Sequence, residues 1–160
     1  MEINITVTGV DELKERLENP DLLGQPIREF FSDIIIDVVP EIQDNTPVDI
    51  GQLKASFPMG APDSNTEIDS SDIPAWATIG TLVDYGPYVE DDTSPHWTSW
   101  TNLNEWAYRH DMNVYALQAA IARRGTKGHH MVQLAFDNLV ARMPDYLEKL
   151  KSNIEGQFGK

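Results

Sequence analysis

The sequence predicts an α+β fold in which a small antiparallel sheet packs against several helices. Two long segments with helical apolar periodicity, one in the first half of the chain and one near its C-terminal end, predict two long helices. Short β-like runs separated by turn residues lie between them. Helices on both sides of one cluster of strands are typical of α+β domains. The 160 residues fit a single domain, 1–160, with enough length to bury a core.

The N-terminal segment combines a strand with a short helix. Residues 2–8 alternate apolar and polar side chains, which predicts a half-buried strand that ends at Gly9. A short helix is expected over 10–18, because its acidic residues lie in the first turns, where the helix dipole favours negative charge. Asn19 and Pro20 end it.

The next segment predicts the strongest helix of the first half, from Asp21 or Pro26 to Gln43. Its apolar residues recur at helical offsets over four turns, and they are Ile27, Phe30, Phe31, Ile34, Ile35, Val38, Val39 and Ile42. A β-branched strand over 34–39 is the weaker alternative. Pro40 lacks an amide hydrogen, so a kink or an early end is expected there.

A fold-defining turn follows this helix. Pro47 disfavours a helical conformation in the residue before it, so the helix should stop by Asn45. Asp49 is expected to accept a hydrogen bond from a backbone amide two or three residues on, and Gly51 permits a backbone angle that side chains resist. A strand should then begin, because apolar side chains alternate at Leu53, Ala55 and Phe57.

The middle of the chain reads as loops and short strands. Residues 58–74 are polar and lack periodicity, which predicts a mobile loop. A strand is expected over 76–81, paired with the strand over 53–57, and a tight turn over 85–88.

Three further helices are expected. Trp97, Trp100 and Trp106 approximate one helical face, with Ser99 or Thr101 as cap, and a second helical segment covers 114–122. The last long helix starts near His130 and continues to about Ile154, with inward-facing residues expected at Met131, Leu134, Ala135, Leu139 and Met143. Pro144 predicts a kink or restart, and residues 156–160 should fray.

Composition excludes several classes of protein. The chain has no cysteine, which excludes disulfides and thiolate chemistry. No apolar run approaches the roughly 20 residues that span a bilayer, and the N-terminus has no signal-like core, so neither a membrane nor export is expected. A formal net charge of −14 repels polyanions. This charge has three possible explanations: a solvated acidic surface, adaptation to high salt, or an acidic channel that lets DNA slide.

The residues do not form a recognisable catalytic, metal or cofactor set. His96, His110, His129 and His130 show no HExxH pair, and neighbouring histidines on a helix point apart. Neither a nucleophile elbow nor a phosphate-binding loop occurs. Arg124 and His129 match the Arg-x4-6-His spacing of helical ribonuclease toxins, but Gly125 and Gly128 would break the helix that those enzymes need. The sequence therefore favours a protein without enzymatic activity, metal or cofactor.

A basic, glycine-punctuated loop and a group of aromatic residues are the candidate contact sites. The loop contains Arg123, Arg124, Lys127, His129 and His130. These residues either cap the preceding helix and pair with local carboxylates, or contact a neighbouring subunit or DNA. The aromatic residues are Trp97, Trp100, Trp106, Tyr108 and Tyr115, and core packing is the preferred interpretation, with an interface as the alternative if several are exposed.

Three blocks carry a resemblance to a known family. They are residues 46–57 (TPVDIGQLKASF), 76–97 (WATIGTLVDYGPYVEDDTSPHW) and 121–140 (IARRGTKGHHMVQLAFDNLV). In order and spacing they resemble the neck and tail-completion family of long-tailed phages, over roughly residues 30–140. The family usually ends the second block with an acidic residue and a Gly-Thr pair, whereas here Asp92 precedes Thr93.

The resemblance implies a virion protein of the head-tail neck that assembles as an oligomeric ring around the DNA channel. It implies contacts with other copies of the chain and with neighbouring neck proteins, namely the head-closure protein or stopper and the tail terminator or tail tube. Non-specific contact with DNA is also implied. Together with the acidic composition, it suggests a virus of a halophilic host. A tail assembly factor that does not stay in the virion is an alternative.

Overall fold

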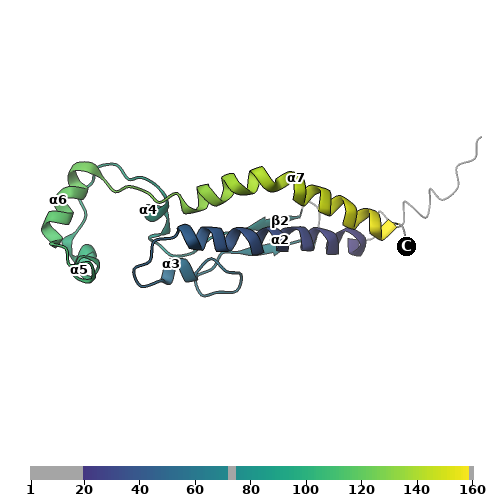
Figure 1. The fold of residues 1–160 in the computed structure, drawn as a ribbon. Helices are drawn as coiled ribbons and strands as arrows, with labels where there is room; N and C mark the ends of the chain where they lie inside the picture. Colours follow the sequence, from purple (N-terminus) through teal and green to yellow (C-terminus); the bar gives the residue numbers. More distant parts are fainter. Residues whose placement is uncertain (1–19, 72–74, 159–160) are drawn as a thin grey trace, which may run out of the picture.

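The computed structural model describes residues 20–71 and 75–158, and its fold is mixed α+β with helices predominant, as predicted. Two long helices, α2 (Pro20–Asn45) and α7 (Met131–Phe158), lie side by side (Figure 1). The remaining elements are the helices α3 (Gln52–Ala55), α4 (Gly86–Glu90), α5 (Trp100–Arg109) and α6 (Val114–Arg124) and the strands β1 (Glu67–Asp69) and β2 (Trp76–Thr78). The strand predicted over 2–8 and the helix predicted over 10–18 lie outside the described residues.

The hydrophobic core forms where α2 packs against α7. The apolar positions that the periodicity of α2 predicted are buried, and they are Ile34, Ile35, Val38, Val39 and Ile42. Helix α7 contributes Met131, Ala135 and Leu139, which follow one another at helical spacing. Leu134 was predicted to face inward and is exposed instead. Burial of this stripe is therefore what holds the two long helices together.

A row of polar contacts runs along one edge of the helix pair. The contacts join Asp33 to Lys149, Asp37 to Tyr146 and Glu41 to Arg142. Residue numbers rise along α2 as they fall along α7, so the two helices are antiparallel. Burial and the hydrogen bond to Asp37 raise the pKa of Tyr146 to about 12. The buried Nη2 of Arg142 forms no hydrogen bond among the described residues, but it lies 2.6 Å from Oε1 of Glu41, so charge attraction compensates its burial.

Prolines inside the long helices do not end them. Helix α2 continues through Pro40 to Asn45, and α7 continues through Pro144 to Phe158. The early end considered at Pro40 and the restart considered at Pro144 are therefore wrong for the described residues. A proline removes the hydrogen bond to the carbonyl four residues earlier, which for Pro40 is that of Ile36 on the exposed side of α2. Burial of Ile42 beyond Pro40 favours continuation of the helix.

The sheet consists of β1 and β2, and it differs from the predicted pairing. The strands are antiparallel with Ile68 opposite Ala77, and a separate bridge joins Ser64 to Thr81. Strand β1 lies inside the segment 58–74 that was predicted to be a loop. The partner predicted for the second strand, residues 53–57, is not in the sheet. Ile68 and Ala77 are partly buried against the core, so the small sheet covers the side of the helix pair.

Residues 52–55 form helix α3 where a strand was predicted. Gly51 has a φ of 85° and precedes the helix, and the amide of Ala55 donates to the carbonyl of Gly51 at 2.9 Å. The buried residues are Leu53, Ser56 and Phe57, whereas Ala55 is exposed. Their spacing of three and four is helical, so the apparent alternation was misleading. The tight turn predicted over 85–88 is likewise the start of helix α4.

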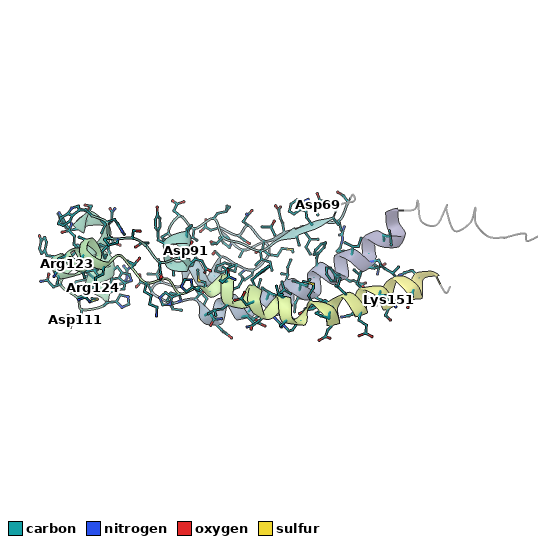
Figure 2. All side chains as sticks on the ribbon, turned by 90° about the horizontal axis from the view of Figure 1, so that it is seen from above. Asp69, Asp91, Asp111, Arg123, Arg124 and Lys151 are labelled. Carbon is teal, nitrogen blue, oxygen red and sulfur yellow. The ribbon has the colours of Figure 1, made fainter. Side chains whose placement is uncertain are left out.

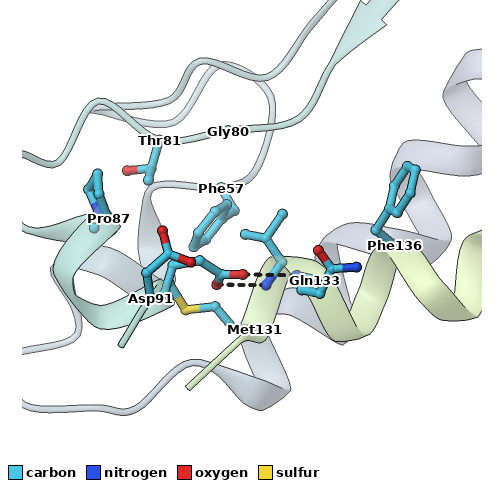
Figure 3. Close-up of a pocket in the computed structure, with 11 residues that line it drawn as sticks. Phe57, Gly80, Thr81, Pro87, Asp91, Met131, Gln133 and Phe136 are labelled. Atoms are coloured by element: carbon cyan, nitrogen blue, oxygen red, sulfur yellow. Dashed lines mark hydrogen bonds between the residues drawn. The ribbon is translucent and has the colours of Figure 1, made fainter. Parts of the chain in front are cut away.

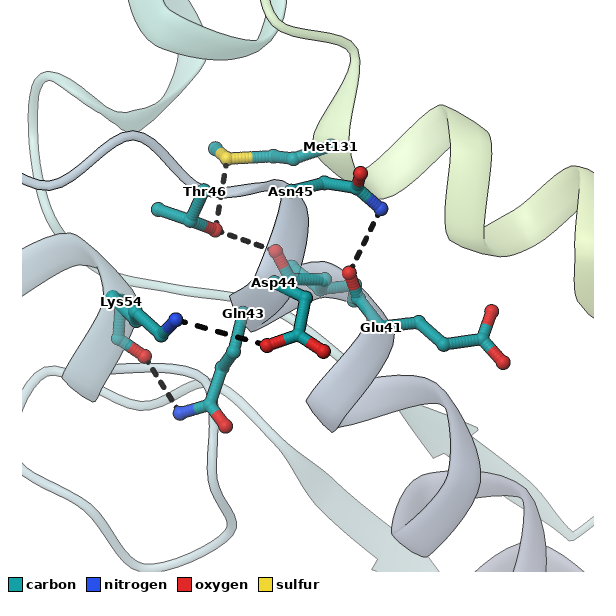
Figure 4. A network of polar contacts seen from close by, with 8 residues as sticks. Glu41, Gln43, Asp44, Asn45, Thr46, Lys54 and Met131 are labelled. Carbon is teal, nitrogen blue, oxygen red and sulfur yellow. Dashed lines mark hydrogen bonds and ion pairs between the residues drawn. The ribbon is translucent and has the colours of Figure 1, made fainter.

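The junction after α2 is held by polar contacts (Figure 4). The buried hydroxyl of Thr46 lies 2.6 Å from the carbonyl oxygen of Ile42 and 3.2 Å from the sulfur of Met131 at the start of α7. The side-chain amide of Gln43 donates to the carbonyl of Lys54 in α3 at 2.8 Å. The end of α2 is therefore attached to both α3 and α7. The predicted end of the helix by Asn45 is confirmed.

Candidate interaction surface

Helices α5 and α6 form a helical hairpin that stands away from the rest of the molecule (Figure 1). We call residues 100–124 the hairpin, and α2, α3, α4, β1, β2 and α7 the body. Ser99 caps α5, as expected, because its hydroxyl accepts from the amide of Thr101. The carboxamide of Asn113 caps α6 in the same way. The two helices bury Ala107, Gln118 and Ile121.

Two connecting segments, residues 91–99 and 125–130, join the hairpin to the body, and we call them the stem. The amide of Thr93 donates to the carbonyl of Thr126 at 2.9 Å, and the amide of Thr126 donates to the hydroxyl of Thr93 at 2.8 Å. The stem requires glycine at two positions. A Cβ at Gly125 would lie 1.8 Å from the carbonyl oxygen of Thr93, and one at Gly128 would lie 2.3 Å from that of Glu90.

The end of α4 positions the second half of the stem and the start of α7. The carboxylate of Glu90 accepts hydrogen bonds from the amides of Val132 and Gln133, at 3.0 and 2.9 Å. These amides have no partner within their helix. The helix dipole stabilises the negative charge of Glu90 at this N-terminal end. The amides of His129 and His130 donate to the carbonyls of Val89 and Glu90. The backbone of the glycine-rich loop is therefore part of the scaffold.

Asp49 connects the body to the hairpin. Both carboxylate oxygens of Asp49 accept from the guanidinium of Arg109, at the end of α5, with 2.8 Å between Nε and Oδ1. The Nε2 atom of His110 lies 3.3 Å from Oδ1, and the ring of Trp106 stacks on His110 with 4.2 Å between centroids. The hydrogen bond from Arg109 holds the pKa of Asp49 below its usual value.

The predicted fold-defining turn is therefore only partly as expected. Pro47 follows the end of α2, Gly51 has the left-handed backbone angle that glycine favours, and Leu53 is buried. Asp49 does not close the turn among the described residues, because its side chain bonds to Arg109 instead of a nearby amide. A bidentate contact with a guanidinium is stronger than a single bond to a neutral amide, which explains this choice.

Of the basic loop residues, Lys127, His129 and His130 belong to the stem, and Arg123 and Arg124 lie at the hairpin end of the molecule. Figure 2 shows Arg123 and Arg124 there, with Lys151 toward the opposite end. The Nε of Arg123 donates to the carbonyl of Ala119, which is the helix-capping role considered from the sequence. Among the residues that the structure describes, no carboxylate lies within ion-pair distance of Arg123, Arg124 or Lys127.

The two histidines of the loop differ in their surroundings. The imidazole of His130 lies 3.9 Å from the carboxylate of Asp92. His129 is exposed. Neither histidine belongs to a cluster that could hold a metal ion, because the described residues contain no such cluster.

The aromatic residues of the hairpin region are exposed, so the preferred core interpretation is wrong. Trp97, Tyr108 and Tyr115 are 74%, 86% and 64% exposed, and Trp100 and Trp106 are also accessible. The two helices are short and pack on each other, so a thin hairpin has too little interior for five large side chains. Several exposed aromatic side chains in one region, here the hairpin and the adjoining stem, mark a candidate interaction surface.

The body has a groove beside the stem (Figure 3). Its volume is about 460 Å³, and it opens between α4 and the first turns of α7. Buried Phe57 and Met131 and exposed Phe136 give it an apolar wall, and Glu90 and Asp91 contribute carboxylates. No hairpin residue lines the groove. It is therefore an apolar surface with negative charge that the chain's own hairpin leaves open.

Comparisons with protein-family models, with curated proteins and with solved structures found no match. In the described part of the chain, no cluster of three or more histidine or acidic side chains could hold a metal ion. Nor does any helix there have the length and apolar character needed to cross a membrane.

Sequence reasoning missed two residues of this region. Arg109 lies 60 residues from Asp49, and Glu90 lies 42 residues from Val132. No local sequence pattern reveals a contact between residues that are so far apart in the chain. The glycines at 125 and 128 were the available signal, because their spacing indicated a loop with a demanding backbone. They gave no indication of which segment would approach that loop.

Proposed function

We propose that this chain is a non-enzymatic structural protein of the virion neck, which joins the head connector to the tail tube as part of an oligomeric ring around the DNA channel. Its partners are other copies of itself, the head-closure protein or stopper, and the tail terminator or tail tube. It acts through protein contacts and channel geometry, without a cofactor. The virion is its site of action, and the host cytoplasm its site of assembly.

The observation that carries the proposal is the exposure of large aromatic side chains on the hairpin and the adjoining stem. Side chains such as Trp97, Tyr108 and Tyr115 are costly to leave in water, and they become useful when a partner covers them. The hairpin stands away from the body, which makes it accessible to a neighbour (Figure 1). A protein that acts by assembly needs such a surface.

The three blocks that resemble the tail-completion family also meet in space. Residues 46–57 contain the loop after α2 and helix α3, and Thr46 contacts Met131 in the third block. The second block contains α4 and the first half of the stem, and the carbonyls of Val89 and Glu90 in α4 accept from the amides of His129 and His130 in the third block. Blocks that are distant in the sequence thus form one structural unit, which supports the resemblance.

The charge of the molecule fits a component of a channel or a virus of a halophile. Helix α2 alone contains six carboxylates and one arginine. Such a surface repels the phosphates of DNA, so DNA would pass it without sticking. High salt would screen the repulsion between the carboxylates themselves. The basic loop at the hairpin is the place where contact with DNA would be attractive.

The ribonuclease alternative gains no support from the geometry. Arg124 is the last residue of α6, and His129 lies in the extended stem that follows. The two residues therefore do not share the helix that such an active site requires. RNA cleavage that disappears in His129→Ala would restore this alternative.

The test of the proposal is a cryo-electron density map of purified virus particles. We expect the chain in a symmetric ring at the head-tail junction, which would also give the copy number. Its absence from the particle would overturn the neck role and favour an assembly factor.

Charge reversal of Arg123, Arg124 and Lys127 tests the basic loop separately. We expect fewer complete particles, whereas Lys151→Glu, at the opposite end of the molecule, should leave assembly unchanged. Normal assembly of the triple variant would show that the basic loop is not a contact.

A further inference from the structure

We propose that the chain binds single-stranded DNA where the hairpin meets the stem, through a surface formed by Trp97, Arg123, Arg124 and Lys127. We call these four residues the cationic surface. The three basic side chains contact phosphates, and the indole of Trp97 stacks on an unpaired base. The inference rests on the proposed function for the presence of DNA, and it assigns the DNA contact to one site and to one form of DNA.

Two contacts hold the first half of the stem along the end of α6. The carbonyl of Thr98 accepts from the side-chain amide of Gln118 at 2.6 Å, and the amide of Thr93 donates to the carbonyl of Thr126 at 2.9 Å. The last turn of α6, with its two arginines, lies between Gln118 and Thr126 in the sequence. Trp97 lies between the two contacts on the facing segment, so the fold places it beside the end of α6.

The backbone under the cationic surface is closely packed. A Cβ at Gly125 would lie 1.8 Å from the carbonyl oxygen of Thr93, and one at Gly128 would lie 2.3 Å from that of Glu90. The two halves of the stem therefore touch without a layer of side chains between them. A main chain that is fixed in this way needs little reordering on binding, which lowers the entropic cost of the contact.

The basic side chains of the surface are available to a ligand. The Nε of Arg123 donates to the carbonyl of Ala119 at 3.0 Å, and this bond leaves the hydrogens on its Nη atoms for other acceptors. Among the described residues, no carboxylate lies within ion-pair distance of Arg123, Arg124 or Lys127. Phosphate oxygens match the planar donors of a guanidinium in pairs, so the two arginines suit a phosphate backbone.

The carboxylates of the stem are engaged elsewhere. Asp91 lines the groove of the body. Oδ1 of Asp92 accepts from the amide of Gly128 at 2.7 Å and lies 3.9 Å from Nε2 of His130. These carboxylates therefore do not neutralise the cationic surface.

The carboxylates of the hairpin belong to its other end. Glu105 lies 3.7 Å from the guanidinium of Arg109, near the end of α5. Asp111 precedes α6, and the 11 residues of this helix separate it from Arg124 by about 15 Å. The hairpin thus has an end with both signs of charge, near Asp111, and a positive end at the stem.

The pattern of charge favours a nucleic acid over an acidic protein. The sequence has no aspartate or glutamate in 93–104 or in 112–136. A phosphate backbone carries only negative charge and fits a surface of one sign, whereas protein surfaces normally carry both signs. The net charge of −14 repels DNA from the rest of the molecule. The hairpin stands away from the body (Figure 1), and the screening length of about 8 Å at physiological salt limits that repulsion at the cationic surface.

Trp97 makes an unpaired strand the preferred ligand. Its side chain is 74% exposed, so the indole is open to a ligand. Base faces are accessible to an indole in a single strand, whereas in a duplex they are stacked on one another. Proteins that bind single strands without reading sequence combine such aromatic platforms with a positively charged surface.

Fluorescence anisotropy of a labelled oligothymidylate of about 12 nucleotides measures the binding by the purified full chain. We expect tighter binding of this strand than of a duplex of the same length. The logarithm of the association constant should fall with the logarithm of the salt concentration with a slope of about −2, because three cations each neutralise one phosphate. Absence of binding at low salt up to about 10⁻⁴ M protein would overturn the proposal.

Charge variants test the phosphate contacts. In a triple variant, Arg123, Arg124 and Lys127 become glutamine, and we expect a loss of affinity of at least about tenfold and a slope near zero. The matched control replaces Arg28, Lys54 and Lys151 of the body by glutamine, which changes the net charge by the same amount and should leave the slope unchanged. Circular dichroism checks that both variants are folded. Equal losses in the two variants would show that net charge alone acts, which would overturn the site.

A substitution of Trp97 tests the stacking. We expect Trp97→Ala to weaken binding of the oligothymidylate at least about fivefold and to leave duplex binding unchanged, whereas Trp97→Phe should retain most of the affinity. Tyr115→Ala is the matched control, because Tyr115 is an exposed aromatic residue at the other end of α6. Equal affinity for single strand and duplex, with no effect of Trp97→Ala, would overturn the preference for unpaired DNA.

Competitors distinguish the other ligands. Polyglutamate that displaces the oligothymidylate at equal charge concentration would overturn the assignment to a nucleic acid and indicate an acidic protein partner. An oligouridylate should bind no more tightly than the oligothymidylate, because neither contact reads the 2′-hydroxyl. Tighter binding of the oligouridylate would make RNA the ligand and overturn the assignment to DNA.

The DNA site and the neck function can fail separately. Binding by the purified chain, combined with absence of the chain from particles, would remove the neck role and leave the site. A ring at the neck, combined with no binding of either oligonucleotide by the purified chain, would remove the site and leave the neck role.

Discussion

At the scale of single residues, Asp49 fixes the hairpin to the body through Arg109. Because the hydrogen bond from Arg109 lowers the pKa of the Asp49 carboxyl, we expect Arg109→Gln to raise that pKa toward its usual value. Carbon-detected NMR of the side-chain carboxyl measures the change. Asp69 is the internal control, because the hydrogen bonds from Ser71 lower its pKa and do not involve Arg109. An unchanged Asp49 titration would contradict the contact.

The same group gives a pH dependence of stability. A pKa that is lower in the folded state makes a contribution that is fully present above the unfolded value of about 3.9 and is lost as the pH falls through the folded value. We therefore expect Asp49→Asn to destabilise the protein near neutral pH. We also expect the variant to lose less stability than the wild type when the pH is lowered further. Thermal unfolding followed from pH 7 downward measures both effects. A variant whose acid dependence matches that of the wild type would show that Asp49 makes no such contribution.

Gly125 is the residue at which a side chain is least tolerated. Its φ is 73°, and a Cβ would lie 1.8 Å from the carbonyl oxygen of Thr93, so Gly125→Ala must shift the stem. We expect a loss of about 1–3 kcal/mol in the free energy of unfolding. Denaturant unfolding measures it. The control is Gly156→Ala in α7, which meets no atom within 4 Å and should be neutral or stabilising by up to about 1 kcal/mol.

At the scale of the elements, α2 stabilises the fold through its buried face. Ile42 is 1% exposed in the core, whereas Ile36 on the same helix is 67% exposed. We expect Ile42→Ala to lower the free energy of unfolding by about 2–5 kcal/mol, because it leaves a cavity against α7. Ile36→Ala should change it by less than about 0.5 kcal/mol. Equal effects of the two substitutions would contradict the packing described for α2.

At the scale of the whole molecule, charge sets the response to salt. A net charge of −14 makes the folded chain repel itself, and the screening length falls from about 10 Å at 0.1 M salt to about 3 Å at 1 M. We expect the melting temperature to rise with sodium chloride over that range. A variant in which exposed Asp84, Asp145 and Glu148 are amides should show a smaller rise. A melting temperature that is insensitive to salt would exclude self-repulsion as an important factor.

The two long helices and the buried face of α2 could be predicted from the sequence alone. The apolar offsets of α2 and the cap at Ser99 depend on residues within a few turns of one another, so local chemistry is sufficient. The same reasoning failed at Leu53, Ala55 and Phe57. Three residues are too few to distinguish alternation from a short helix, and the burial of Leu53, Ser56 and Phe57 against the core decided for the helix.

The sheet pairing, the exposure of the aromatic residues and the partner of Asp49 could not be predicted from the sequence. Each depends on segments that are far apart in the sequence. Arg109 could have remained in water, and it pairs with Asp49 because the stem places the end of α5 beside the loop after α2. Tyr115 is exposed because α6 packs on α5 and on no larger layer. A local pattern gives the face of a helix, and the folded chain determines whether anything covers that face.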